Sequence, residues 1–287
     1  MAWLCPNCRE PLDERELACC NHHPFVSEDG VLVLLKDDFH RELGAFQAHL
    51  GAARAAEHKR LLEPEAYTRL PFGQERARDK GWQLEWRLRC YDWAVVQELL
   101  NGRVRQRVLD VGAWNGWLSQ RLARQGHLVT AVDFFSDAFD GLRARKHYPA
   151  PTWQAAQMDL RDLTVLNQSF DVIVLNRCLQ FFPHPADYVA EARRLLAPGG
   201  LLILTGLQIF RDPRAKARAV AARQREYRER FGAELFLFPN KGYLDADDAR
   251  RLRALGVRLR PYAQLWRAAL KAWLDPALPR HRYGLWP

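Results

Sequence analysis

Short apolar segments alternate with segments of helical spacing through the second half of the chain. The apolar segments have the length and the Val, Ile and Leu content of buried strands. We predict strands at 106–112, 128–133, 152–157, 170–176, 201–205 and 257–262, with helices between them at 116–125, 136–147 and 185–196. Strands and helices that alternate in this rhythm are typical of right-handed βαβ units. The pattern therefore predicts an α/β fold with a doubly wound, mainly parallel sheet.

Helical spacing also appears on both sides of this core. Apolar residues at positions i, i+4, i+7 and i+11 from Phe39 to Leu50 indicate one face of a helix. From Trp82 to Leu100, a row of Trp and aliphatic residues at helical spacing indicates a second helix, in which core packing explains the Trp residues better than a stacking platform does. Further helices are predicted at 213–231 and between a cap at Asp245 and a stop at Gly256. The tail to Pro287 has no clear pattern.

Length and composition are those of one sizeable core with a small appendage: 287 residues, 48% of them hydrophobic. The net charge of +9 favours acidic partners but does not bear on the fold. The arginines of the helix at 213–231 are explained by a cationic face exposed to solvent, although a surface that binds RNA would have a similar sequence. The N-terminus lacks a secretory pattern, and the longest apolar run, near 201–204, is too short to cross a bilayer. We therefore expect a cytoplasmic protein without a membrane span.

Four of the six cysteines lie within the first 20 residues, which favours a metal site over a disulfide scaffold. Cys5 and Cys8 form a CxxC turn, and Cys19 and His23 follow at a spacing that suits a small ribbon. These four residues predict a tetrahedral Cys3His site for a structural zinc ion. Cys20 or His22 could replace one of the ligands, and a pair of exposed, inert thiols is the alternative.

A glycine-bearing turn joins the first predicted strand of the core to the first helix. The stretch VLDVGAWNG at 108–116 places Gly112 and Gly116 where backbone N–H groups and a helix N-terminus can face a ligand. The next strand ends in Asp133, whose carboxylate is suited to accept hydrogen bonds from the two hydroxyls of a ribose. Together these features indicate a cofactor that contains a nucleoside.

Over about residues 82–262 the chain resembles class I S-adenosylmethionine-dependent methyltransferases. The motifs that carry the resemblance occur in order: VLDVGAWNG at 108–116, AVD at 131–133, MDL at 158–160, FDVIVLN at 170–176 and LLAPGGLLIL at 195–204. The resemblance implies a Rossmann-like sheet of the seven-stranded type and S-adenosylmethionine as cofactor. From Cys5 to about Leu35 the chain resembles the N-terminal zinc domain of bacterial 23S rRNA guanine methyltransferases. We accordingly predict a zinc ribbon at 1–35, a helical connector and lid at 36–104, and a methyltransferase domain at 105–287.

The same resemblance implies a set of cofactor-binding residues. Asp110 would lie near the cofactor amine, Asp133 would hold the ribose, Phe134 would lie against the adenine, and Asp159 would accept from the adenine amine. The remaining residues of the set line the predicted pocket: Gly112, Ala113, Asn115, Gly116, Leu160 and Asn176, with Arg87, or alternatively Arg89, for the cofactor carboxylate. Trp114 departs from the family, which usually has glycine there. Three outcomes are open: the indole points away from the cofactor, it narrows the pocket, or it marks a degenerate site.

Methyl transfer by direct displacement needs alignment of donor and acceptor more than a base. Tyr67, His147 and Gln180 are the candidate catalytic residues, with Tyr67 in a loop that could act as a lid. For His147, a favourable cation at a helix end is the simpler interpretation. We expect an unidentified small-molecule acceptor. The alternatives are an rRNA or tRNA base methyltransferase and a non-catalytic scaffold with a degenerate pocket, and the oligomeric state is not predicted.

Overall fold

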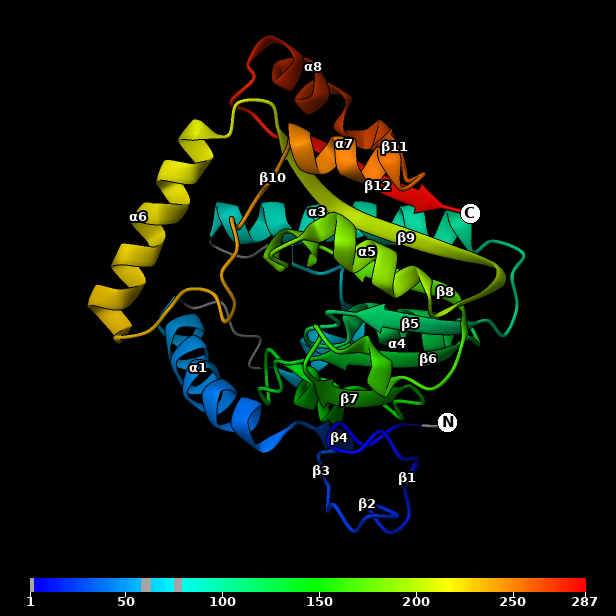
Figure 1. The fold of residues 1–287 in the computed structure, drawn as a ribbon. Coiled ribbons are helices and arrows are strands. Elements are labelled where there is room, and N and C mark those ends of the chain that lie inside the picture. The colour runs from blue at the N-terminus through cyan, green and yellow to red at the C-terminus, as the bar shows by residue number, and fades with distance from the viewer. Residues whose placement is uncertain (1–2, 58–62, 75–78) are drawn as a thin grey trace.

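The computed structural model describes residues 3–57, 63–74 and 79–287. Within these residues, one sheet of ten strands runs through the molecule (Figure 1). Seven neighbouring strands lie in the order β7-β6-β5-β8-β9-β12-β11. Their bounds are β5 (Arg107–Val111), β6 (Leu128–Asp133), β7 (Gln154–Met158), β8 (Phe170–Asn176), β9 (Leu196–Phe210), β11 (Arg258–Pro261) and β12 (Arg280–Trp286). The first five are parallel and β12 is antiparallel to β9, which confirms the predicted mainly parallel, seven-stranded sheet.

Helices cover both faces of this sheet. Successive side chains of a strand point to opposite faces, and β5 shows the result: Val108 packs into one hydrophobic cluster, Leu109 and Val111 into another. The first cluster also contains buried residues of α3 (Lys80–Leu99) and α4 (Trp117–Arg124). The second contains residues of α5 (Pro185–Arg193) and α7 (Ala246–Ala254), the latter begun by the predicted cap at Asp245. The fold is therefore doubly wound, as predicted.

One predicted helix is largely absent. In place of a helix at 136–147, the chain forms a turn and then a short 3-10 helix, η1 (Leu142–His147). The side chain of Asp137 accepts hydrogen bonds from the backbone N–H groups of Phe139 and Asp140, at 2.8 and 2.9 Å. Such local side-chain bonds compete with the helical pattern and hold the chain in a turn. The helix prediction was therefore wrong for residues 136–141.

The N-terminal segment continues the sheet. β4 (Val31–Leu34) pairs in parallel with β7, and β3 (Val26–Glu28) pairs with β4 as the edge strand. The four side chains of β4 are buried. Beyond them, the short strands β1 (Leu12–Asp13) and β2 (Ala18–Cys19) form a separate two-stranded sheet. The predicted boundary at residue 35 thus falls at the end of a strand of the main sheet.

Two helices stand beside the sheet and border its carboxyl-terminal edge. They are α1 (Asp37–Ala56) and α6 (Arg214–Phe231), drawn in blue and yellow in Figure 1. The remaining elements are α2 (Pro64–Arg69), α8 (Trp266–Leu274), β10 (Leu244–Asp245) and the 3-10 helices η2 (Leu163–Val165), η3 (Leu179–Phe181) and η4 (Ala263–Leu265). Among the described helices, none combines the length and the apolar character that crossing a bilayer would need.

Candidate functional site

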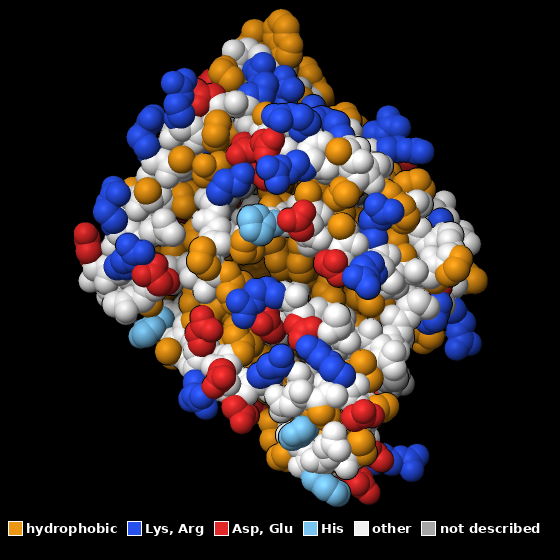
Figure 2. Space-filling view, in the orientation of Figure 1, with side chains coloured by type: hydrophobic (Ala, Val, Ile, Leu, Met, Phe, Trp, Pro, Cys, Tyr) orange, Lys and Arg blue, Asp and Glu red, His pale blue; other side chains and the backbone are white. Residues whose placement is uncertain are grey.

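A cavity of about 580 Å³ opens at the carboxyl ends of β5, β6 and β8. Its floor comes from the loops that follow these strands, and its walls come from α1, α3, α6 and the segment 235–240. Figure 2 shows the molecule hollowed in the middle of the face drawn, with hydrophobic side chains inside the hollow. The volume lies within the range of small-molecule sites, which is about 300–1,000 Å³. This is the position at which open parallel sheets bind their ligands.

The glycine-bearing turn after β5 forms one side of the cavity. Gly112 has a φ of 68°, and a Cβ there would lie 2.7 Å from Cβ of Cys178, so a larger residue would collide with the loop after β8. Gly112 and Ala113 line the cavity. Asn115 and Gly116 lie behind it: Asn115 is fully buried, and a Cβ on Gly116 would meet the ring of Trp153 at 2.4 Å. Packing on the side away from the cavity, at Asn115 and Gly116, therefore fixes the conformation of the turn.

Trp114 has the unusual backbone angle that its position in the turn requires, with a φ of 52°. Its ring lies against Trp86, at 5.7 Å between ring centroids, and beneath the guanidinium groups of Arg89 and Arg54, at 4.8 and 5.3 Å. Both arginines line the same cavity. The indole is therefore part of the wall, and the cavity remains open beside it.

Asp133, at the end of β6, also lines the cavity. Its carboxylate accepts hydrogen bonds from the backbone N–H groups of Trp114, at 2.8 Å, and Phe135, at 2.9 Å. Burial raises the pKa of this group to about 6, although these N–H groups oppose the shift. Phe134 follows at the cavity wall. A carboxylate has further lone pairs, so Asp133 retains acceptor capacity toward a ligand.

Two buried polar atoms face this region without a protein partner. Asp110 is fully buried; its Oδ2 accepts from the hydroxyl of Ser119 at 2.6 Å, while Oδ1 has no hydrogen bond within the described structure. Burial raises the pKa of Asp110 to about 7. Nδ2 of Asn176, at the end of β8, likewise has no partner among the described residues. Since unpaired buried polar atoms are costly, these two atoms indicate a polar ligand in the cavity.

Of the other predicted cofactor-binding residues, some line the cavity and others do not. Leu160 lines the cavity, but Asp159 is not among its lining residues and pairs with Arg161 through two oxygens, at 2.6 and 2.9 Å. Arg87 is exposed and does not line the cavity, whereas its alternative, Arg89, does. Burial lowers the pKa of Arg89 to about 10, which leaves the guanidinium charged at neutral pH.

Of the three candidate catalytic residues, only Gln180 borders the cavity. Tyr67 is 1% exposed and donates its hydroxyl proton to the carbonyl of Phe139 at 2.6 Å. His147 stacks on Tyr67 at 4.9 Å, and its Nε2 lies 3.0 Å from the carbonyl oxygen of Ala138. These contacts join α2 to η1 away from the cavity.

A second cavity of about 310 Å³ adjoins the first between β9, α6 and the segment 235–243. The two cavities share Gln180, Phe181, Gln208, Arg223, Leu235 and Phe236. Lys216 and Tyr243 belong to the second cavity alone, and neither a carboxylate nor an imidazole is present among its described lining residues. Arg223 is paired with Glu57 and Glu226, while Lys216 makes no ion pair with a described residue.

A buried polar network supports the loop after β8. Asp92 of α3, which is 1% exposed, accepts from the hydroxyl of Tyr262 at 2.6 Å and from Nη1 of Arg177 at 3.2 Å. Tyr262 in turn accepts from the backbone N–H of Gly206 at 2.8 Å. Arg177 has a φ of 56° and lines the cavity. Asp92 was not identified from the sequence, although an acid directly before Trp93 in a Trp-rich helix was a visible signal.

The segment 235–240 was missed as well. Leu235, Phe236, Leu237 and Phe238 all line the main cavity, and the ring of Phe238 lies 3.9 Å from the guanidinium carbon of Arg161. The run of alternating Leu and Phe was the signal in the sequence. Its position over the cavity depends on α6, which returns the chain to this edge of the sheet.

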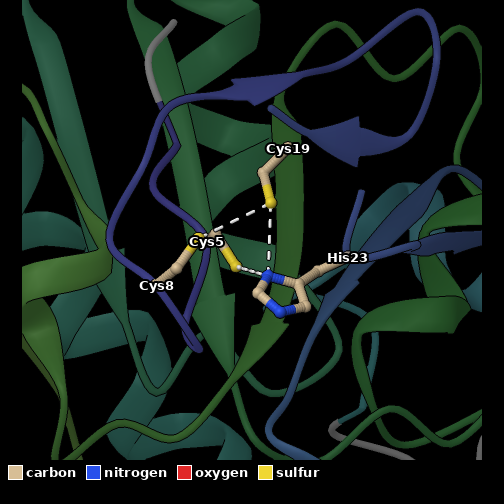
Figure 3. Close-up of side chains that lie close together, drawn as sticks. All are labelled: Cys5, Cys8, Cys19 and His23. Atoms are coloured by element: carbon tan, nitrogen blue, oxygen red, sulfur yellow. Dashed lines mark hydrogen bonds between the residues drawn. The ribbon is translucent and has the colours of Figure 1, made fainter. Parts of the chain in front are cut away.

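The predicted metal ligands meet at the N-terminus (Figure 3). The ligand atoms of Cys5, Cys8, Cys19 and His23 lie within 4.8 Å of one another. Nδ1 of His23 lies 3.4 Å from Sγ of Cys5 and 3.3 Å from Sγ of Cys19, and the thiols of Cys8 and Cys19 are 3.6 Å apart. Tetrahedral bonds of about 2.3 Å to sulfur and 2.0 Å to nitrogen place ligand atoms roughly 3.5–3.8 Å apart, so the cluster has the size of a zinc site. Cys20 is exposed and outside the cluster.

Comparison with known proteins agrees with the position of the main cavity. Residues 109–204, about a third of the chain, match the model of a family described as a methyltransferase domain. This range contains the turn after β5, the end of β6, and β8 with most of β9. This match supports the predicted methyltransferase domain of the S-adenosylmethionine-dependent class.

Curated relatives match the same part of the chain. The ubiquinone biosynthesis O-methyltransferase of Actinobacillus pleuropneumoniae serotype 7 is 31% identical over 116 residues, covering 38% of this chain and 49% of the relative. The malonyl-acyl-carrier-protein O-methyltransferase of Hahella chejuensis is 34% identical over 104 residues, covering 36% of this chain and 37% of the relative. The chain thus spans half or less of the length of these relatives.

A solved structure, magnesium protoporphyrin IX methyltransferase from Synechocystis PCC 6803 with bound SAH, is 16% identical and has a TM-score of 0.48. The alignment covers 78% of this chain and 94% of that one. The two curated relatives are named as O-methyltransferases of ubiquinone biosynthesis and of malonyl-acyl-carrier protein, and these names give no support to the alternative of an RNA base methyltransferase.

Proposed function

We propose that this chain transfers a methyl group from S-adenosylmethionine to an oxygen atom of a small acidic acceptor. The observation that carries the proposal is the pair of unpartnered polar atoms, Oδ1 of Asp110 and Nδ2 of Asn176, beside a cavity of ligand size at the carboxyl edge of the sheet. The relatives named as O-methyltransferases support oxygen as the acceptor atom.

The residues around the main cavity fit the cofactor. Asp133 would accept from the ribose hydroxyls, Asp110 would complement the cofactor ammonium, and the close approach at Gly112 would leave the backbone in contact with the ligand. Arg89, rather than Arg87, would hold the cofactor carboxylate, because it lines the cavity. When bound, the cofactor supplies an electrophilic methyl group on a sulfonium.

The second cavity would hold the acceptor. Its aromatic walls, from Phe181, Phe236 and Tyr243, suit a planar molecule, and Lys216 supplies positive charge. Because a nearby cation favours the ionised form of an acid, Lys216 would lower the pKa of a phenol or carboxylic acid held there. An ionised oxygen needs no general base, which agrees with the absence of carboxylate and imidazole among the described lining residues. Gln180 would orient the acceptor and not take its proton.

The N-terminal cluster would hold one structural zinc ion. Three thiolates and one imidazole leave a tetrahedral metal without an open position, so the ion would stabilise the fold and take no part in methyl transfer. Its effect would reach the main sheet, because Cys5 and Cys19 are buried in the same hydrophobic cluster as Leu32 and Leu34 of β4.

Calorimetric titration with S-adenosylhomocysteine tests the cofactor site. We expect micromolar binding by the wild type and binding weakened by about tenfold or more in Asp133→Ala, a loss of about 1.4 kcal/mol or more. Asp171→Ala is the matched control, because Asp171 lies at the start of β8 and pairs with Arg107. A folded wild type that does not bind, or equal affinities in all three proteins, would exclude this site.

A further inference from the structure

The short helix α8 turns its large apolar side chains away from the protein. Trp266, Leu270, Trp273 and Leu274 are 61%, 54%, 65% and 70% exposed. Their positions, i, i+4, i+7 and i+8, place all four on one stripe of the helix. We call this stripe the α8 stripe. It is a contiguous set of exposed aromatic and aliphatic side chains, unlike single exposed apolar residues, which are ordinary.

The opposite side of α8 attaches the helix to the protein through small groups. Ala272 is fully buried, and Ala268 and Ala269 are partly buried. Arg211 donates hydrogen bonds to the carbonyls of Ala272 and Trp273 at 2.8 and 2.7 Å and so caps the C-terminal end of the helix. The usual amphipathic arrangement is therefore reversed, since alanine packs inward and Trp and Leu face outward. The exposed Trp and Leu side chains of the α8 stripe therefore do not contribute to packing within this chain.

Positive charge flanks the α8 stripe. Arg267 and Lys271 are exposed on the helix, and the helix itself contains neither Asp nor Glu. Asp275 follows the helix, and its carboxylate accepts from the backbone N–H of Ala277 at 2.9 Å. The whole chain carries a net charge of +9. A helix with Trp and Leu on one face and Lys and Arg beside them is suited to the interface of an anionic membrane.

The place of α8 in the molecule permits such contact. It stands at one end of the molecule, and the strands β1 and β2 lie at the other (Figure 1). In the space-filling view this end is a tip of hydrophobic side chains with Lys and Arg side chains beneath it (Figure 2). A projecting tip can enter the headgroup region without contact between the lipid and the rest of the fold.

We propose that the α8 stripe docks the protein on the surface of a membrane that contains anionic lipid. Trp266, Leu270, Trp273 and Leu274 enter the interface, and Arg267 and Lys271 pair with lipid headgroups. A second copy of this chain fits the stripe less well, because a symmetric pairing would bring the cations of two α8 helices close together. This docking is independent of the methyl-transfer reaction.

Co-sedimentation of the full chain with lipid vesicles tests the proposal. We expect binding to phosphatidylcholine vesicles that contain about one third phosphatidylglycerol, weakened by salt, and much weaker binding to pure phosphatidylcholine. Trp266→Ala/Trp273→Ala should lower the partition coefficient by about tenfold or more. Arg267→Gln/Lys271→Gln should weaken binding to the anionic vesicles only. Val104→Ala, a change at a valine that is 78% exposed in the loop before β5, should bind as the wild type does.

Circular dichroism and melting temperature check that each variant is folded. No binding by the wild type would overturn the proposal, as would binding that the double Trp variant retains in full. Sedimentation velocity tests the alternative occupant of the α8 stripe, which is a second copy of this chain. A wild type that is dimeric and does not bind vesicles, together with a monomeric Trp266→Ala/Trp273→Ala variant, would assign the stripe to self-association and overturn membrane docking.

Discussion

Two buried carboxyl groups, those of Asp110 and Asp133, line the main cavity. Asp110 and Asp133 have raised pKa values, about 7 and about 6, and burial is the largest cause for both. Neither forms an ion pair within the described structure. A site that holds buried acids without a cationic partner is prepared for a ligand that brings the missing donors or positive charge.

These pKa values predict how stability depends on pH. An aspartate in the unfolded chain titrates near about pH 3.9. Above that value and below about pH 7, the folded protein retains a proton on Asp110 that the unfolded chain has lost, so this group lowers the free energy of unfolding as the pH rises. Relative to wild type, ligand-free Asp110→Asn should therefore gain stability, by about 1 kcal/mol or more, between about pH 4 and pH 8.

Urea denaturation at several pH values measures this difference. Asp171→Asn is the control, because pairing with Arg107 lowers the pKa of Asp171, and the stability this pair contributes is lost only as the pH falls through that lowered value. Its difference from wild type should be constant above about pH 5. A constant difference for Asp110→Asn as well would show that Asp110 has an ordinary pKa.

Trp114 shows how one residue can depart from a family without closing its site. The turn needs a positive φ, which glycine adopts more readily than tryptophan. Here the ring packs on Trp86 and beneath Arg54 and Arg89, and these contacts offset the backbone strain. The departure from glycine was visible in the sequence, but the direction of the ring depended on α1 and α3, which contribute Arg54, Trp86 and Arg89.

We expect the stability of the N-terminal ribbon to depend on a bound metal ion. Without zinc, three thiols and an imidazole would be held close together by two-residue strands alone. We predict one zinc per chain by native mass spectrometry, lost in Cys5→Ser and retained in Cys20→Ser, because Cys20 lies outside the cluster. Chelation or Cys5→Ser should lower the melting temperature by several degrees. Full metal content in Cys5→Ser would assign the ligands differently.

The C-terminal elements were the least predictable. The tail gave no pattern, yet it contains α8 and the long strand β12, which lies between β9 and β11. β12 reads RHRYGLW, with basic residues in a strand and a glycine that fits closely against Leu204 and Val257. Such a strand is specified by its partners more than by its own propensity, because β propensity depends strongly on context.

The whole molecule is bound together by the extension of its sheet. β4 pairs with β7, and Val31, Leu32, Val33 and Leu34 are all buried, each contributing about 1.5–3 kcal/mol by transfer. Deletion of residues 1–35 would expose the edge of β7 together with apolar side chains. We therefore predict that the deleted chain aggregates or melts at least about 10 °C lower than the full chain.

Differential scanning calorimetry and light scattering measure the effect of the deletion. Cys5→Ser separates the two causes, since it removes a metal ligand and keeps β4 in place; we expect it to be milder than the deletion. A deleted chain that melts like wild type would show that the segment 1–35 is an independent domain, as the sequence suggested.

Local order in the sequence determined the class of fold and the outline of the site. The signals are the apolar runs of strand length, the glycine turn after Val111, the acid at Asp133 and the close Cys and His spacing. Each lies within a few residues, so it can be recognised without knowing which distant residues pack against it. From them we predicted the parallel sheet, the methyltransferase domain and the four Cys and His residues that meet at the N-terminus.

Only the tertiary structure decided which side chains meet across long separations. It brought Arg89 and not Arg87 to the cavity, paired Asp159 with Arg161, placed Tyr67 and His147 against η1, and joined β4 to the main sheet. It also left the α8 stripe exposed. These outcomes depend on which elements pack together, and packing is a property of the assembled core that no short stretch of sequence specifies.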